Sequence, residues 1–257
     1  MTDFQKIAAT AENKIKKLEE NFPGYLMLSV LAGMYIGFGI LLVFTISGQL
    51  NGAPYTKLIM GACFACALSL VIIAGAELFT GNNLVMTAGY LDKKVSLPKV
   101  LKLWGICWIG NLIGSIFLAF LFSLTGLYSG ATLEAVISAA ETKMSAGVLQ
   151  LLARGMLCNM LVCLAVWCAN KATSDSGKLI MVFWCILAFF TTGFEHSVAN
   201  MTLLTLALIN NNGSEVISFA GYCYNLGIVT VGNMLGGIFL VGVPYFISER
   251  EKYEQKR

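Results

Sequence analysis

Long apolar stretches, separated by short polar segments, make up most of the chain. A helix needs about 20 apolar residues to cross a bilayer, and each of these stretches reaches that length. The stretches lie near residues 24–46, 58–90, 103–124, 146–170, 179–208 and 218–247. This pattern predicts an all-α integral membrane protein with six spans, which places both termini on the same side of the membrane.

The second and fifth stretches are too long for one straight crossing. The second carries a charge, Glu77, near its middle, and the fifth carries Glu195 in the same way. We expect each stretch to be two half-helices joined by an irregular segment, at 76–83 and at 193–200. Irregular backbone at membrane depth is tolerated where it lines a cavity or is buried in protein, so both breaks are candidate pore elements.

The two halves of the chain resemble each other. AGMYIG at 32–37 aligns with RGMLCN at 154–159, and GNLIGSIFL at 110–118 aligns with GNMLGGIFL at 232–240, both at an offset of 122 residues. A repeat of three spans must insert its second copy upside down relative to the first. The sequence therefore predicts an inverted 3+3 repeat and an aquaporin-like protomer, with the substrate path between broken helices near the midplane.

The N-terminal segment shows a different pattern. Apolar residues recur there at helical spacing, opposite several lysines. They are Phe4, Ile7, Ala8, Ala11, Ile15, Leu18 and Phe22. We expect residues 1–22 to form an amphipathic helix on the cytoplasmic surface, residues 23–247 to form the channel domain, and residues 248–257 to form a charged cytoplasmic tail.

Composition and charge agree with a membrane protein and orient it. Hydrophobic residues make up 57% of the chain and charged residues 12%, and the mean hydropathy is +0.76. Lys57 and Lys143 lie on one side of the predicted spans and Arg154 lies inside a span, whereas the other basic residues share the side of the termini. The positive-inside rule then places both termini in the cytoplasm. The basic residues form no patch interleaved with aromatic residues, which argues against a nucleic-acid partner.

The eight cysteines all fall inside apolar stretches, where cysteine packs as a small, soft residue. Cys63 and Cys66 have CxxC spacing, but no second pair or second histidine accompanies them. We expect no metal site and no cofactor.

The chain has one histidine, His196, and it follows Glu195 in the second break. An ionisable group inside a membrane is a functional candidate by default, because a near-neutral imidazole can donate to a passing anion or share a proton with it. Thr80 adds a hydroxyl in the first break, and Asn159 could hydrogen-bond the histidine ring and select its protonated nitrogen. An ordinary interhelical hydrogen bond is the alternative for Asn159. At the 118-residue offset that relates the breaks, the counterpart of His196 is Leu78.

The remaining polar residues of the breaks have structural interpretations. Asn82 and Asn200 share the 118-residue offset and can cap the half-helices or satisfy backbone groups that the breaks leave free. Glu77, Glu195 and Arg154 can pair with one another or satisfy backbone groups in the breaks, because an unpaired charge at this depth is costly.

Two lysines are candidates for drawing anions toward the pore. Lys143 would stand in the outer vestibule, and Lys16 would play the matching part on the cytoplasmic side.

The segments AELFTGN at 76–82, RGMLCNMLV at 154–162 and GFEHSVANM at 193–201, with the paired GNxxGxIFL segments, resemble the formate/nitrite transporter family. The likeness is greatest to its clostridial hydrosulfide-channel branch. It implies a homopentamer in a bacterial cytoplasmic membrane, in contact with lipid, with one pore in each protomer.

The resemblance also implies residue roles. Thr80 would lie on a flexible loop of the second span, with Asn159 and His196 at the pore centre. Two apolar slits would flank that centre. The matching positions are Phe64 and Phe189 toward the outside, and Leu68, Leu78, Phe79 and Val162 toward the cytoplasm.

Together these features predict a channel, not an enzyme, for small monovalent anions of weak acids. Hydrosulfide is the first choice of substrate, with formate and nitrite also permeant. Chloride should pass poorly because it cannot share a proton with the histidine. A proton-coupled formate or nitrite transporter remains the alternative, since the same histidine could carry a proton. A water or neutral-solute channel is disfavoured because paired Asn-Pro-Ala breaks are missing.

Overall fold

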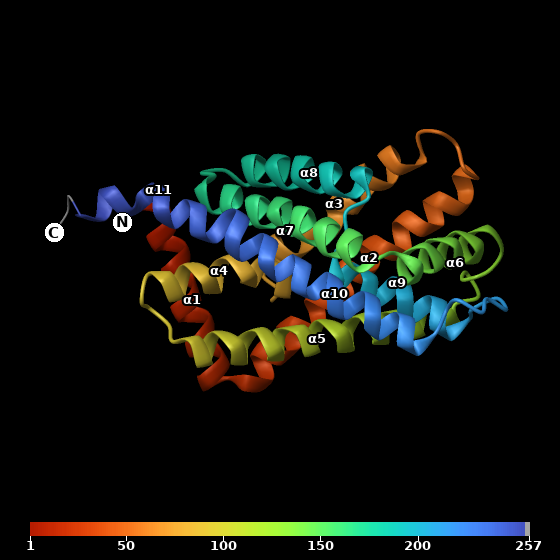
Figure 1. Ribbon diagram of the computed structural model, residues 1–257, viewed down its shortest axis with the longest axis horizontal. Coiled ribbons are helices and arrows are strands. Elements are labelled where there is room, and N and C mark those ends of the chain that lie inside the picture. Colours follow the sequence, from red (N-terminus) through yellow and green to blue (C-terminus); the bar gives the residue numbers. More distant parts are fainter. Residues whose placement is uncertain (255–257) are drawn as a thin grey trace.

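The computed structural model describes the backbone of residues 1–254 and the side chains of residues 1–249, and this part of the chain is helical with no strand (Figure 1). The helices, with one π-helical turn labelled η1, are α1 (Asp3–Glu20), α2 (Phe22–Leu50), α3 (Thr56–Ala74), α4 (Phe79–Leu91), α5 (Leu97–Leu124), α6 (Gly130–Ser145), α7 (Val148–Lys171), α8 (Asp175–Thr192), α9 (Ser197–Ile209), α10 (Phe219–Gly237), η1 (Ile238–Gly242) and α11 (Val243–Glu254).

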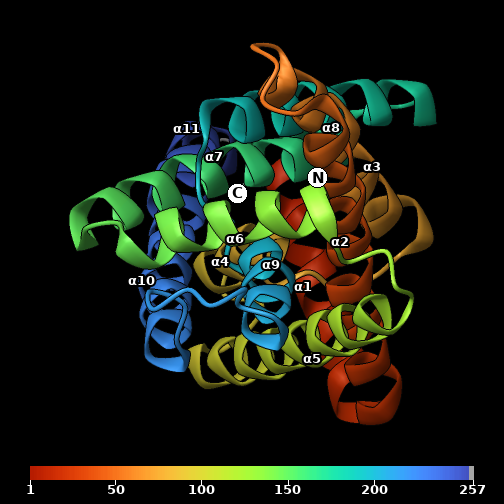
Figure 2. The same cartoon turned by 90° about the vertical axis from the view of Figure 1, so that its right-hand side faces the viewer.

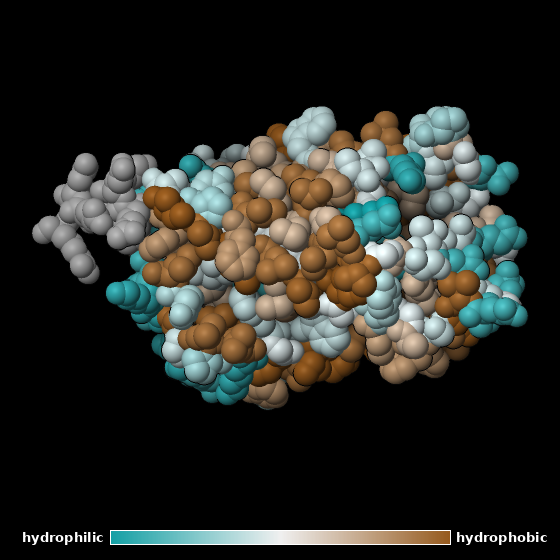
Figure 3. Space-filling model, in the orientation of Figure 1, coloured by the Kyte–Doolittle hydropathy of each residue, from teal (hydrophilic) through white to brown (hydrophobic). Residues whose placement is uncertain are grey.

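Six helical segments are long and apolar enough to cross a membrane, which confirms the predicted spans. They are α2, α3, α5, α7, α8 and the continuous run from α10 through η1 into α11. Figure 3 shows apolar side chains gathered over the middle of one face and hydrophilic ones mostly toward the two ends of the long axis. That distribution suits a molecule whose middle faces lipid.

Both broken spans are present, and their irregular segments are shorter than predicted. Only residues 75–78 and 193–196 leave the helical conformation. Gly75 and Gly193 end α3 and α8 in the left-handed region, at φ +78° and +81°, a conformation that glycine adopts without steric penalty. Thr80 therefore belongs to the first turn of α4 and not to a flexible loop.

The half-helices α4 and α9 lie inside the bundle, where other helices surround them. Figure 2 looks onto the α6 end of the molecule, and α9 lies there among α2, α5, α6 and α10. Every residue of α9 from Ser197 to Ala207 is buried, as is every residue of α4 from Phe79 to Gly89. Over these residues neither helix has a solvent or lipid face, which explains why apolar side chains are found on every side of both helices.

The amphipathic helix α1 packs on the protein. Its apolar face contacts α4 and α2, and the six apolar side chains of that face are at most 5% exposed: Phe4, Ile7, Ala8, Ala11, Ile15 and Leu18. The termini meet on this side of the bundle, where the Phe4 N–H donates to the Glu249 carboxylate. Phe22, assigned to α1 from the sequence, begins α2 and is 47% exposed. The sequence boundaries at 22/23 and 247/248 thus fall at or inside helices, and residues 255–257 of the predicted tail lie outside the described part.

The sequence did not predict α6, which is the counterpart of α1 in the second repeat. It precedes the fourth span as α1 precedes the first, and the two helices lie at opposite ends of the molecule (Figure 1). The repeat unit is therefore one short helix followed by three spans.

Glycines bring two pairs of spans into backbone contact. A Cβ on Gly114 of α5 would overlap the carbonyl oxygen of Val30 in α2, and a Cβ on Gly236 of α10 would overlap that of Met156 in α7. Small residues allow such close approach between membrane helices.

We expect Gly236→Ala to lower the free energy of unfolding of the detergent-solubilised protein by about 1–3 kcal/mol, and its melting temperature with it. The reason is that α7 and α10 must separate to admit the methyl group. Gly227→Ala is the matched control on the same helix, since no atom lies within 4 Å of its Cβ position. Equal melting temperatures for the two variants would contradict the close-packing interpretation.

Candidate functional site

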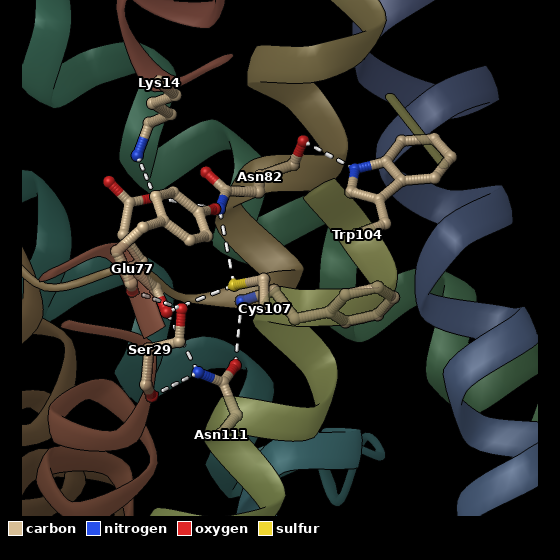
Figure 4. Close-up of polar contacts among 9 residues, drawn as sticks. Lys14, Ser29, Glu77, Asn82, Trp104, Cys107 and Asn111 are labelled. Atoms are coloured by element: carbon tan, nitrogen blue, oxygen red, sulfur yellow. Dashed lines mark hydrogen bonds and ion pairs between the residues drawn. The ribbon is translucent and has the colours of Figure 1, made fainter. Parts of the chain in front are cut away.

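Two asparagines hold the helix breaks in equivalent ways. Asn111 of α5 accepts the Phe79 N–H at 2.9 Å and donates to the carbonyl oxygens of Glu77 and Ser29. Figure 4 shows these contacts around the first break. Each asparagine amide thus satisfies backbone groups that the interruption leaves free.

Asn233 of α10 repeats this pattern at the second break. It accepts the Ser197 N–H at 2.9 Å and donates to the carbonyl oxygens of Glu195 and Gly155. Sequence reasoning overlooked both asparagines as site residues, although the repeated GNxxG segments contain them.

These contacts also correct the alignment of the first and fourth spans. The Glu77 N–H donates to the Leu28 carbonyl and the Glu195 N–H to the Arg154 carbonyl, so Leu28 corresponds to Arg154. The offset in these spans is 126 residues, one helical turn away from the 122 inferred from sequence.

The two glutamates do not pair with each other or with Arg154. Glu195 binds Lys143 of α6, with the ammonium nitrogen 2.7 and 2.8 Å from its two oxygens. Glu77 binds Lys14 of α1 through its Oε2 atom (Figure 4). Each short helix therefore supplies the counterion for the glutamate of its own repeat.

Lys14, and not Lys16, thus matches Lys143. The Lys16 ammonium lies 3.9 Å from the Glu20 carboxylate, and both side chains are about two-thirds exposed.

Asn82 and Asn200 hold these glutamates, and neither caps a half-helix. The Asn82 amide donates to Glu77 at 3.0 Å, and the Asn200 amide donates to Glu195 at 2.6 Å. The next partner differs between the repeats, because Asn82 also contacts the Cys107 thiol whereas Asn200 contacts the Asn225 amide.

His196 is the N-cap residue of α9, and its ring joins the two broken spans. Nδ1 accepts the Ala199 N–H at 3.1 Å, and Nε2 lies 3.0 Å from the Thr80 hydroxyl. A nitrogen that accepts a backbone N–H carries no proton, so the neutral ring has its proton on Nε2. The ring therefore presents an N–H donor to Thr80, and both side chains are at least 96% buried.

Asn159 binds Thr80 and not the histidine ring. Its amide nitrogen lies 3.3 Å from the Thr80 carbonyl oxygen, 2.9 Å from the Asn83 side-chain oxygen and 2.7 Å from the Asn233 carbonyl oxygen. The predicted role in selecting the imidazole tautomer is wrong, because the backbone of α9 makes that selection. Asn159 instead fixes the first turn of α4, which carries the Thr80 hydroxyl.

Two vestibules approach this centre from opposite ends. The α6-side vestibule has a volume of about 630 Å³ and reaches Phe189, Glu195 and His196. The α1-side vestibule has a volume of about 250 Å³ and reaches Leu68 and Leu78.

The apolar side chains assigned to the two slits are buried next to the vestibules. The Phe64 and Phe189 rings meet edge to face at 6.0 Å, and Phe189 stacks on the His196 ring at the same centroid distance. Phe64 and Val162 line neither vestibule and are at most 2% exposed. Phe79 is equally buried and its N–H is held by Asn111.

Comparisons with known proteins agree with this arrangement. The nitrite transporter NirC of Escherichia coli is 43% identical over 250 residues, which cover 95% of this chain and 91% of that protein. The formate channel BtFdhC of Bacillus thuringiensis is 31% identical, with 96% and 95% covered.

Solved structures give the same result. A structure described as an FNT family ion channel superposes with a TM-score of 0.91 at 39% identity, covering 96% of this chain and 98% of its own. A pentameric formate channel with formate bound superposes with a TM-score of 0.78 at 29% identity, covering 87% and 96%.

The family model described as formate/nitrite transporter matches residues 2–247, which include both breaks, both short helices and all six spans. The chain belongs to the formate/nitrite transporter family.

Proposed function

We propose that the chain is a channel for small monovalent anions of weak acids, with nitrite, formate and hydrosulfide as its substrates. One observation carries the proposal: an imidazole N–H and a hydroxyl, from His196 and Thr80, meet in a buried position at the inner end of the α6-side vestibule. An anion that enters this point loses its water. The two donors replace part of the lost hydration.

The three proposed substrates are supported by different observations. Nitrite and formate follow from what the named relatives are said to carry. Hydrosulfide, the first choice from the sequence, rests on the resemblance to the clostridial branch and stays a prediction.

The capping bond at Nδ1 favours a channel over a transporter that loads a proton on the histidine. A second proton on the ring would have to reside on Nδ1, where it would face the Ala199 N–H instead of accepting from it. The cationic ring would therefore break the cap of α9. In this mechanism His196 donates a hydrogen bond to the anion, and its imidazole ring stays neutral.

The membrane arrangement follows from charge and exposure. We place the α1 end, with both termini, in the cytoplasm, because the basic residues outside the spans concentrate there. We also propose a homopentamer with one pore per protomer, by analogy with the pentameric formate channel. The exposed apolar residues on the outer surfaces of the spans, such as Phe117, Phe120 and Trp184, would then contact lipid or a neighbouring protomer.

Purified protein in liposomes tests the proposal. We expect downhill flux of nitrite, formate and hydrosulfide, and much slower flux of chloride, at clamped zero potential. Flux should stay downhill when a pH gradient is imposed. Accumulation of formate against its own gradient at the expense of protons would support the transporter instead. Equal rates for chloride and formate would contradict the proposed selectivity for anions of weak acids.

A further inference from the structure

The two vestibules differ in charge. Three cations and one anion line the α6-side vestibule, for a formal charge of +2: they are Lys57, Lys143, Arg154 and Glu195. One cation and one anion, Lys14 and Glu77, line the α1-side vestibule, for a formal charge of zero. The symmetry of the fold therefore does not extend to the electrostatics of the two entrances.

The ion pairs leave this difference unchanged and show which cations carry it. Lys143 is neutralised by Glu195, and Lys14 by Glu77. The guanidinium of Arg154, in contrast, has no hydrogen bond or ion pair with any side chain between residues 1 and 249. Its counterpart in the first repeat, Leu28, is apolar. Arg154 is thus a cation of one repeat only, in the vestibule that leads to His196.

Arg154 is also well placed for a passing anion. Its carbonyl oxygen accepts the Glu195 N–H at 3.3 Å, so its Cα is fixed beside the break that carries His196. The side chain is half-buried in a vestibule with apolar walls such as Phe190 and Phe194. Low-dielectric walls focus the field of a cation and raise the local concentration of anions.

We propose that Arg154 forms an anion-capture site in the α6-side vestibule, in addition to the donor pair of His196 and Thr80. The proposal rests on the proposed anion channel and adds a side preference to it. The guanidinium fork can hold both oxygens of formate or nitrite, whereas hydrosulfide offers one acceptor atom. The site therefore favours planar two-oxygen anions.

The capture site predicts different half-saturation concentrations for the two directions. A passive pore cannot pump, so the ratio of maximal rate to half-saturation concentration must be equal in both directions. We expect entry from the α6 side to saturate at about fivefold lower formate concentration than entry from the α1 side, with a correspondingly lower maximal rate. The difference should shrink above about 0.15 M salt, where exposed charges are screened within about 8 Å.

The test uses full-length protein in liposomes of one orientation, with formate flux measured in each direction at low salt and zero potential. In Arg154→Gln the two half-saturation concentrations should converge. In Arg154→Lys the half-saturation concentrations for entry from the two sides should still differ for hydrosulfide, but they should become nearly equal for formate. Lys99→Gln, which removes an exposed lysine 48% accessible on the α1 side, should leave both values unchanged.

The outcomes separate the two proposals. Absence of anion flux in the unaltered protein would overturn the channel itself. Flux with equal half-saturation concentrations, or a side difference that persists in Arg154→Gln, would overturn the capture site alone. If Arg154→Gln does not assemble, Arg154→Lys still tests the proposal. An unchanged difference between the two half-saturation concentrations for formate in that variant would contradict the bidentate site.

Discussion

Replacing His196 by phenylalanine should lower anion flux by about 100-fold. The substitution removes the Nε2–H donor that faces Thr80, and a hydrogen bond to a charged group contributes about 1.5–3 kcal/mol. Phenylalanine also adds an apolar ring next to Phe189, so the dry path lengthens. Flux of nitrite or formate into liposomes, normalised to the amount of assembled protein, measures the effect.

The matched control separates the pore role of His196 from its capping role. Asparagine is among the best N-cap residues, but its side chain is too short to hold the Thr80 contact. His196→Asn should therefore keep the melting temperature near that of the unaltered protein and still lose most of the flux. Normal flux in either variant would show that the histidine is structural.

Replacing Lys143 by methionine should destabilise the protein by about 3 kcal/mol. The Glu195 side chain is 3% exposed, and removing one partner of a buried ion pair leaves an uncompensated charge. Asn200 also donates to this carboxylate, so the second break should loosen with it. Thermal unfolding of the detergent-solubilised protein measures the loss.

Two controls define the origin of that loss. Adding Glu195→Gln to Lys143→Met removes the stranded charge, so the double variant should be more stable than the single one. Breaking the exposed pair between Lys99 and Glu19, 48% and 45% accessible, should change stability by at most about 1 kcal/mol. A double variant as unstable as Lys143→Met would mean that packing, and not charge, holds α6 in place.

Hydropathy averaged over the length of a membrane span does not predict α6, because this helix has 16 residues and buries one apolar face only. Its buried residues, Val136, Ile137, Ala140 and Met144, have helical spacing on one face, as those of α1 do. The signal was present but short. The inverted repeat is a second basis for predicting α6, since a helix before the first span implies one before the fourth.

The asparagines show the limit of position-based reasoning. Asn111 and Asn233 recur in the repeated segments, yet sequence alone does not distinguish a clamp on a helix break from a packing residue. Asn159 was assigned to the pore centre, and its amide does lie beside Thr80. Its assignment to the histidine was wrong because the partner of a side chain depends on helix rotation.

The sequence by itself determined the six spans, the two breaks, the inverted repeat and the single histidine in the second break. These features can be predicted from local hydropathy, charge and internal similarity, because each span must itself be apolar and long enough to cross the bilayer. Only the tertiary structure decided the partners: Lys14 for Glu77, Lys143 for Glu195, and the backbone of α9 for His196 Nδ1. The two ion pairs join residues 63 and 52 positions apart in the chain. A shift of two residues, as between Lys16 and Lys14, turns a side chain to the opposite face of a helix and is enough to change its partner.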